Sequence, residues 1–271
     1  MDANLKGLMF KNQNPTSDDI NKSDCQVVNA QDFYESGYFI EALDIVSNAL
    51  EINDQNSKAW HLNSLINLEL KDLFIAEACI NRALLIEDNK TYRDTRSRII
   101  LTEATELYEL KDYDLSIQKL NLFFSIVEDK TSEEYGYASM YKGIMLYNNK
   151  DLKESLYYTN EALKIFPDDD FLQSVKQKCL FSLGNYFYKL KEFDASLEKL
   201  DELLSLIDPD DDLVLCCNIL NNKARVLYAA GYKDEAKNCI DNALEIVPEE
   251  ATETKSSLLY NKILFDNNAE L

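Results

Sequence analysis

The segment NALEIVPEE at residues 242–250 has two close copies earlier in the chain, NALEIND at 48–54 and EALKIFPDD at 161–169. In each copy a short apolar run suited to a helix gives way to an acidic residue or to proline. Such recurrence reflects either repeated use of good helix formers or a chain built from copies of one unit. The spacing of other residues decides between these two readings.

Six copies of a unit align on a small residue that follows a predicted tight turn. The small residues are Ala42, Ala76, Ser116, Ser155, Ser196 and Ala236. Three places earlier stand Phe39, Leu73, Tyr113, Leu152 and Phe193, with Lys233 as the exception. Four places later stand Val46, Ile80, Leu120, Leu200 and Ile240, with Thr159 as the exception, and seven places later Ala49, Ala83, Phe123, Ala162, Leu203 and Ala243. Agreement in so many columns indicates a true repeat of two short helices joined by a turn.

The aligned small residues are separated by 34, 40, 39, 41 and 40 positions. The extra residues of the later intervals fall in the segments 91–96, 130–135, 170–176 and 211–216. They form either longer linkers or extra helical turns. The second reading is favoured because residues 171–184 keep their apolar residues at helical spacing.

Composition agrees with a helical chain. Of 271 residues, 46% are hydrophobic, and there are only 6 Gly and 4 Pro, too few turn formers for a protein of many strands. The net charge of −21 opposes binding to nucleic acid or to anionic membranes. We find no signal peptide and no apolar run long enough to cross a membrane, and six cysteines without a CxxC pair suggest free thiols. We therefore expect a protein of the cytosol or nucleus.

The repeat resembles the tetratricopeptide repeat (TPR). The resemblance rests on Trp60, Gly143, Gly184, Ala76, Ala83, Pro167 and Pro248, which stand at typical TPR places, and it covers roughly residues 23–250. It implies an all-α, right-handed α-α superhelix of six helix pairs, at about 23–56, 57–90, 97–130, 136–169, 177–210 and 217–250. Two copies depart from the family, with Ser116 and Phe123 in the third and Ser196 and Leu203 in the fifth, so we expect looser or shifted helix packing there.

Both ends of the chain differ from the repeats. Residues 1–22 are rich in Asn, Asp and Lys, and we expect them to be disordered or loosely docked. Residues 251–271 predict a capping helix and a tail, with Leu258, Leu259, Ile263, Leu264 and Phe265 as its apolar residues.

No enzyme signature occurs in the sequence, and no cofactor or metal site is expected. The single histidine, His61, has no partner set for a triad or a metal site, and no Gly-rich phosphate loop occurs. The acidic runs at 168–170 and 208–212 have neither the glycine nor the closing Glu of a calcium loop. Function is therefore expected in a binding surface.

In the TPR family the first helix of each pair lines a concave groove, so the resemblance implies a groove for a peptide or partner protein. The expected groove residues are Tyr34, Lys58, His61, Arg98, Tyr108, Tyr147, Lys178, Asn185, Tyr188, Asn221, Arg225 and Tyr228. Four of them are basic, and the predicted face has almost no acidic residue despite the negative chain. We expect aromatic contacts with the partner and Lys or Arg contacts with an acidic group.

The expected function is that of a non-catalytic scaffold or adaptor. The alternative is a co-chaperone-like protein that holds heat-shock chaperones or their clients, because residues 138–170 and 191–231 are also similar to the TPR region of J-domain co-chaperones. The family's carboxylate clamp for EEVD tails is not matched, since its places in the first three copies hold Val27, Gln31, Leu62, Arg98 and Thr102. The J domain's His-Pro-Asp motif does not occur either. The sequence does not distinguish the two functions and leaves the oligomeric state undetermined.

Overall fold

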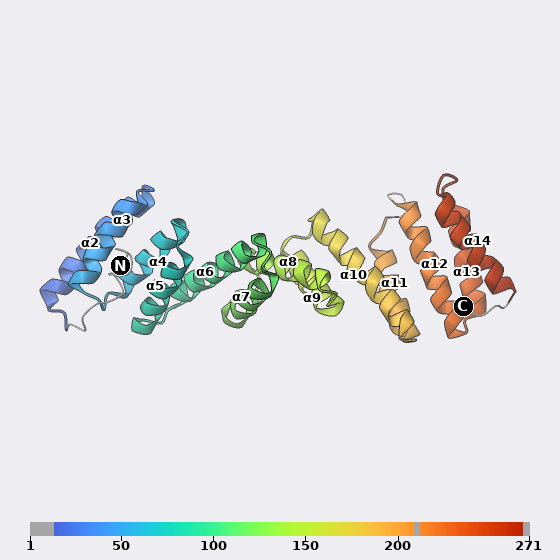
Figure 1. The fold of residues 1–271 in the computed structure, drawn as a ribbon, viewed down its shortest axis with the longest axis horizontal. Helices are drawn as coiled ribbons and strands as arrows, with labels where there is room; N and C mark the ends of the chain where they lie inside the picture. Colours follow the sequence, from blue (N-terminus) through green and yellow to red (C-terminus); the bar gives the residue numbers. More distant parts are fainter. Residues whose placement is uncertain (1–13, 209–211, 268–271) are drawn as a thin grey trace. The chain divides into compact units, whose positions relative to one another are not determined.

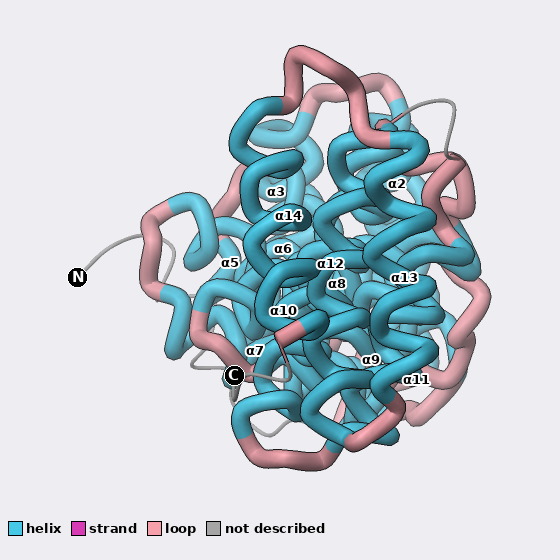
Figure 2. Tube along the Cα trace, turned by 90° about the vertical axis from the view of Figure 1, so that its right-hand side faces the viewer, coloured by secondary structure: helices cyan, strands magenta, loops and turns pink. Residues whose placement is uncertain are grey.

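The computed structural model describes residues 14–208 and 212–267, and these residues form helices and loops only (Figures 1 and 2). The chain divides into two compact units, residues 1–141 and 142–271, each of which is described by itself. Unit 1 contains α2 (Ser17–Glu35), α3 (Phe39–Ile52), α4 (Ser57–Glu69), α5 (Leu73–Ile86), α6 (Lys90–Glu109) and α7 (Tyr113–Ile126). The unit boundary falls within α8 (Glu133–Asn148). Unit 2 continues with α9 (Leu152–Ile165), α10 (Asp170–Lys189), α11 (Phe193–Ser205), α12 (Leu213–Ala230), α13 (Lys233–Ile246) and α14 (Thr252–Asp266).

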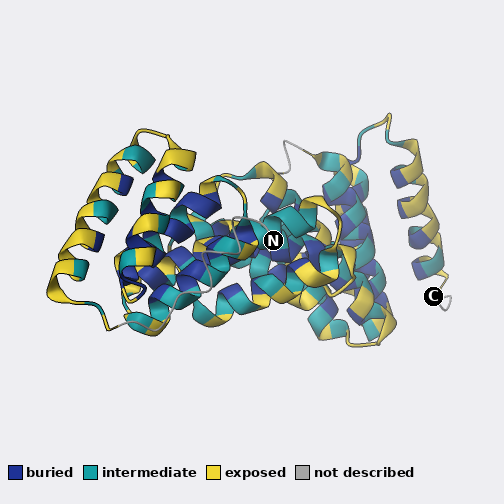
Figure 3. Ribbon diagram, turned by 60° about the vertical axis from the view of Figure 1, so that its left-hand side comes forward, coloured by how far each residue is buried: buried dark blue, intermediate teal, exposed yellow. Residues whose placement is uncertain are grey.

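Each helix packs mainly on its neighbour in sequence. In unit 1 the pairs are α2 with α3, α4 with α5 and α6 with α7, and in unit 2 they include α10 with α11 and α12 with α13. The last helix, α14, packs on both α12 and α13. Within each unit the buried residues face the neighbouring helices and the exposed ones lie on the outer sides (Figure 3). The all-α fold of sequential, TPR-type helix pairs is thus confirmed.

Two small residues meet where the helices of each pair cross. In every pair a buried Gly, Ala or Ser of the first helix precedes the aligned small residue of the second by the same interval: Ala30 with Ala42, Ser64 with Ala76, Ala104 with Ser116, Gly143 with Ser155, Gly184 with Ser196, and Ala224 with Ala236. Their size lets the two backbones approach closely. The small residue on the first helix recurs as regularly as the one on the second helix. An alignment of the second helices alone does not reveal it.

The substituted residues of the third and fifth copies are buried, which contradicts the predicted loosening, while a shift of the helices stays a prediction. Ser116 and Phe123 are fully buried, and so are Ser196 and, within 1%, Leu203. The Oγ atoms of Ser116 and Ser196 donate hydrogen bonds of 2.7 Å to the carbonyls of Ala104 and Gly184 on the partner helix. Since a buried hydroxyl with a partner costs little, serine replaces alanine here without opening the crossing.

Thr159, the exception in the apolar column, is explained by the glycine opposite it. A Cβ placed on Gly143 would lie 2.9 Å from Thr159 Oγ1 and 3.2 Å from the Thr159 backbone nitrogen. Gly143 therefore makes room for the close approach of α9, and Thr159 is fully buried against it.

The turn inside each pair has the same backbone in all six copies. One residue has a left-handed conformation, and it is Gly37, Lys71, Lys111, Lys150, Lys191 or Gly231, always five places before the aligned small residue. Each turn closes with the two hydrogen bonds of a Schellman motif, such as those from the Asp72 and Lys71 amides to the Asn67 and Leu68 carbonyls. The side chains of Asp72 and Asp112 then cap the following helices.

The extra residues of the long intervals are mostly helical turns. Segments 91–96 and 170–176 lie within α6 and α10, which have 20 residues each, and the described part of 211–216 leads into α12. The first helix begins at Ser17, six places before the boundary expected at residue 23, because Thr16 and Asp19 form a reciprocal capping box. The expectation for residues 1–13 lies outside the described residues.

The C-terminal helix, α14, buries one face and exposes apolar residues on another. Leu258 and Phe265 of α14 are fully buried against the rest of unit 2. By contrast, Leu259 is 45% exposed and Ile263 is 60% exposed, although both were expected among the apolar residues of a cap. No helix in the described ranges has the length and apolar character required to cross a membrane.

Candidate functional site

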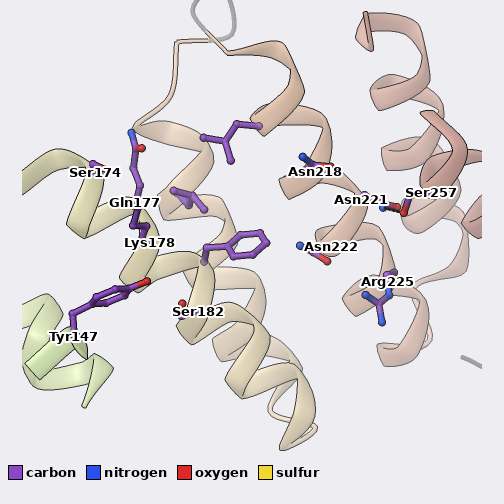
Figure 4. A pocket seen from close by; sticks show the side chains of 13 residues that line it. Tyr147, Ser174, Gln177, Lys178, Ser182, Asn218, Asn221, Asn222, Arg225 and Ser257 are labelled. Atoms are coloured by element: carbon purple, nitrogen blue, oxygen red, sulfur yellow. Dashed lines mark hydrogen bonds between the residues drawn. The ribbon is translucent and has the colours of Figure 1, made fainter. Parts of the chain in front are cut away.

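Unit 2 contains a pocket of about 600 Å³ between α10 and α12 (Figure 4). Single residues of α8, α11 and α14 complete its walls. The lining residues are Tyr147, Ser174, Gln177, Lys178, Phe181, Ser182, Leu203, Leu215, Asn218, Asn221, Asn222, Arg225 and Ser257. A volume of this size accommodates several side chains of a bound molecule.

The extra helical turns of α10 and α12 build the outer part of this pocket. Ser174 and Leu215 belong to those turns, which begin at capping residues Asp169 and Asp212. Each capping carboxylate accepts a hydrogen bond from a backbone amide of the first turn, Leu172 N at 2.8 Å and Leu215 N at 2.9 Å. Negative charge at a helix N-terminus is stabilised in this way, so the acidic loops hold the long helices in place.

Two cations and no carboxylate line the pocket. Lys178 extends from α10 and Arg225 from α12, on opposite walls. Neither side chain forms an ion pair with any carboxylate of the described residues. By contrast, neighbouring lysines do form such pairs, Lys176 with Glu202 and Lys223 with Asp201. In a chain of net charge −21 the lining of this pocket therefore carries a local positive charge.

The guanidinium of Arg225 is positioned by an aromatic ring. Its central carbon lies 5.4 Å from the centroid of the Tyr188 ring, within the range of a cation–π contact. Such a contact restrains the side chain while leaving its N–H donors available. Arg225 is thus held ready to donate to a ligand.

The amides on α12 are oriented from α14. Asn221 donates to Ser257 Oγ at 2.9 Å and accepts from Asn261 Nδ2 at 2.8 Å, while Thr254 Oγ1 donates to Asn218 Oδ1 at 3.2 Å. Asn221 and Asn261 are 7% and 6% exposed. The last helix of the chain thereby fixes one wall of the pocket.

The structure brings four of the seven unit 2 residues that were expected in the groove into this pocket. They are Tyr147, Lys178, Asn221 and Arg225, and Tyr188 supports the site through its contact with Arg225. Asn185 lies on α10 but does not line the pocket. The expectation for Tyr228 is wrong, because its ring is 7% exposed and stacks on Phe265 with centroids 4.3 Å apart.

Two of the five expected residues of unit 1, His61 and Tyr108, pack against side chains of neighbouring helices. His61 accepts or donates a 2.9 Å hydrogen bond with Thr95 Oγ1 and packs against the Tyr92 ring, so it ties α4 to α6. Burial lowers the pKa of His61 below its ordinary value. Tyr108 packs between Tyr113 and Tyr141.

The remaining unit 1 residues lie among acidic side chains. Burial and nearby Glu69 raise the pKa of Tyr34. Arg98 lines a small cavity of about 220 Å³ that also contains Asp94, Asp129 and Glu134. Lys58 is exposed. The expected shortage of acidic residues therefore holds for the unit 2 pocket and fails around Arg98.

Several pocket residues were not among the expected groove residues. Ser174 and Leu215 come from the extra turns, Gln177 and Ser182 from later positions of α10, Leu203 from the second helix α11 and Ser257 from α14. The longer repeat intervals were a signal for the extra turns, since each added turn lengthens a pocket wall. Nothing in the repeat columns indicated Ser257. Among the described residues no cluster of three or more His, Cys, Asp or Glu side chains is arranged to hold a metal ion.

Comparison with known proteins gives one sequence relative and many TPR structures. No family model matches the chain. The chain is 23% identical over 211 residues to the human protein O-mannosyl-transferase TMTC3, a match that covers 77% of this chain and 21% of that protein. It therefore spans about a fifth of the length of that relative.

Solved structures with similar helix arrangements have low identity. Pseudomonas aeruginosa PilF covers 90% of this chain with 99% of its own, at 15% identity and a TM-score of 0.37. YrrB, described as a TPR protein with an unusual peptide-binding site, matches 76% of this chain with 92% of its own chain, at 16% identity and a TM-score of 0.40. The TPR2AB domain of yeast Sti1, solved as a complex with pHSP90, covers 88% with 99% of its own, at 14% and 0.38.

Proposed function

We propose that this TPR-type chain is a non-catalytic protein-interaction module, a scaffold or adaptor that binds a segment of a partner protein in the unit 2 pocket. The pocket combines apolar, amide and charged groups in a volume of about 600 Å³. A protein segment presents the same three kinds of group, namely apolar side chains, backbone amides and charged side chains. Five of the six cysteines are buried free thiols, which supports the expected location in the cytosol or nucleus.

One observation carries the proposal. Lys178 and Arg225 face a common pocket in which no carboxylate balances them, although acidic residues outnumber basic ones 49 to 28 in the chain. Arg225 is held over the Tyr188 ring and Lys178 is exposed, so both charged groups are accessible to a ligand. They are accounted for if a ligand supplies the negative groups.

The co-chaperone alternative predicts a different set of partners. A scaffold would retain a fixed group of proteins in constant proportion. A co-chaperone would retain heat-shock chaperones together with varied clients. Mass spectrometry of the captured proteins separates these two outcomes.

The test is affinity capture with the full chain and a variant whose pocket is filled. Ser182→Trp places a large ring at a half-buried lining position of α10, and Lys189→Trp places the same ring at an exposed position of the same helix. We expect Ser182→Trp to reduce the amount of captured partner at least tenfold, because the ring occupies the pocket volume. We expect Lys189→Trp to capture the partner as the unchanged chain does. Equal capture by both variants, with helical circular dichroism unchanged, would contradict the proposal.

A further inference from the structure

We infer that the unit 2 pocket binds an extended, acidic peptide segment whose separate carboxylates are held one each by Lys178 and Arg225. This inference rests on the proposed function and names the chemistry of the bound segment. It follows from the three kinds of group that line the pocket and from the places they occupy.

The amides indicate a peptide backbone. Asn222 and Gln177 line opposite walls, and within the described parts of the chain neither amide has a hydrogen-bond partner. A side-chain amide carries both donors and an acceptor, so it pairs with the N–H and C=O of an extended chain. Asn218 and Asn221 are already engaged with α14 and leave these two amides for the ligand.

The cations indicate single negative charges. Lys178 stands on α10 and Arg225 on α12, so the positive charge is divided between the two walls. A phosphate group concentrates nearly two negative charges at one point and is best met by clustered cations. Carboxylates along an extended segment each carry one charge, which matches one cation on each wall.

The apolar residues indicate an apolar side chain between the carboxylates. Phe181, Leu203 and Leu215 line the same pocket and are partly or fully buried by unit 2 itself. Leu203 is already buried, but Phe181 and Leu215 are half-buried, and an apolar ligand group that covers these two would remove further apolar surface from water. The segment is therefore acidic with an apolar residue among the acidic ones.

The arrangement differs from the carboxylate clamp of EEVD-binding TPR proteins. The clamp uses Lys and Asn on one first helix, Asn on the next, and Lys and Arg on a third. Here the two cations stand on neighbouring first helices, and Arg225 is held by Tyr188. The ligand is accordingly an internal acidic segment that needs no free C-terminus.

The test measures binding of three synthetic peptides to the full chain by isothermal titration calorimetry. The peptides have one length and alternate Leu with Glu, with Gln or with phosphoserine, and their ends are blocked. Gln replaces each charge-assisted hydrogen bond by a weaker neutral one, so we expect the Glu peptide to bind at least about tenfold more tightly than the Gln peptide. A phosphoserine peptide that bound tenfold more tightly than the Glu peptide would overturn the assignment to carboxylates.

Two variants and one control variant test whether the preference for the Glu peptide arises from the two cations of the pocket. Lys178→Gln and Arg225→Gln should each weaken the Glu peptide about tenfold and leave the weak binding of the Gln peptide unchanged. Lys262→Gln removes the same charge from α14, where Lys262 pairs with Asp241 outside the pocket, and should have no effect. Equal binding of the Glu and Gln peptides, or no binding of either, would overturn the inference.

Failure here is distinguishable from failure of the proposed function. If acidic peptides do not bind but Ser182→Trp still abolishes partner capture, the pocket binds a partner of other chemistry. If neither effect is observed, both proposals are wrong.

Discussion

The single histidine, His61, was predicted to line the groove, but in the structure it holds two helices together. His61 of α4 packs against Tyr92 of α6 with ring centroids 4.6 Å apart and planes inclined by 37°, and it shares a hydrogen bond with Thr95. Burial disfavours the charged imidazolium, which lowers the pKa. The residue therefore contributes to the packing of unit 1, as one expects of many polar residues on first helices.

We predict that His61 titrates below 6.5 in the folded protein. Because the pKa is depressed by folding, its contribution to stability is present above the unfolded value and is lost as the pH falls through the folded value. NMR titration of the imidazole C–H signal measures this directly, since the chain has only one histidine. A pKa at or above 6.5 would show that the ring is solvated and that its contact with Tyr92 is not formed.

At the scale of the element, the turn within each helix pair is the most regular feature of the chain. Four of the six turns place lysine in the left-handed conformation, with φ between 61° and 65°, where two use glycine. For a residue with a Cβ this conformation costs about 1–2 kcal/mol. The repeats therefore retain a small strain that substitution can relieve.

We predict that Lys191→Gly raises the free energy of unfolding by up to about 1 kcal/mol, because released strain exceeds the added flexibility of the unfolded chain. The midpoint of urea unfolding measures the change. Lys191→Ala removes the same charge without relieving the strain and should give no gain. The reciprocal Gly231→Lys, at φ 96° with no atom near its Cβ, should lower the midpoint. A higher urea midpoint for both Lys191→Ala and Lys191→Gly would show that removal of the charge, and not relief of strain, causes the gain in stability.

The helix pairs were predictable because their determinants recur. Small residues at the crossings, apolar residues around them and turns at a fixed offset repeat six times, so one copy reinforces the next. The start of α2 at Ser17 depends on the capping box of Thr16 and Asp19, which occurs once. The hydroxyl–carbonyl bonds of Ser116 and Ser196 need the three-dimensional crossing, and for this reason looser packing was wrongly expected.

On the scale of the whole molecule, the sequence indicated a binding groove but not where along the chain it is suited to a ligand. Twelve residues were expected to line one face. The part on α10 and α12 forms a pocket with cations and without carboxylates, whereas Arg98 in unit 1 shares a small cavity with Asp94, Asp129 and Glu134. The difference arises from residues on the added turns and on α14, which repeat alignment treats as insertions or as a cap.

The central claim is that the partner binds in the unit 2 pocket. The most direct measurement is photo-cross-linking with a benzophenone side chain, introduced into the full chain either at Ser174 in the pocket or at Lys58 in unit 1. Both residues lie on first helices of a pair, Ser174 on α10 and Lys58 on α4, and of the two only Ser174 lines the pocket. We predict a covalent adduct with the captured partner from position 174 and none from position 58. An adduct from position 58 alone, or from neither position while the partner remains bound, would contradict the claim.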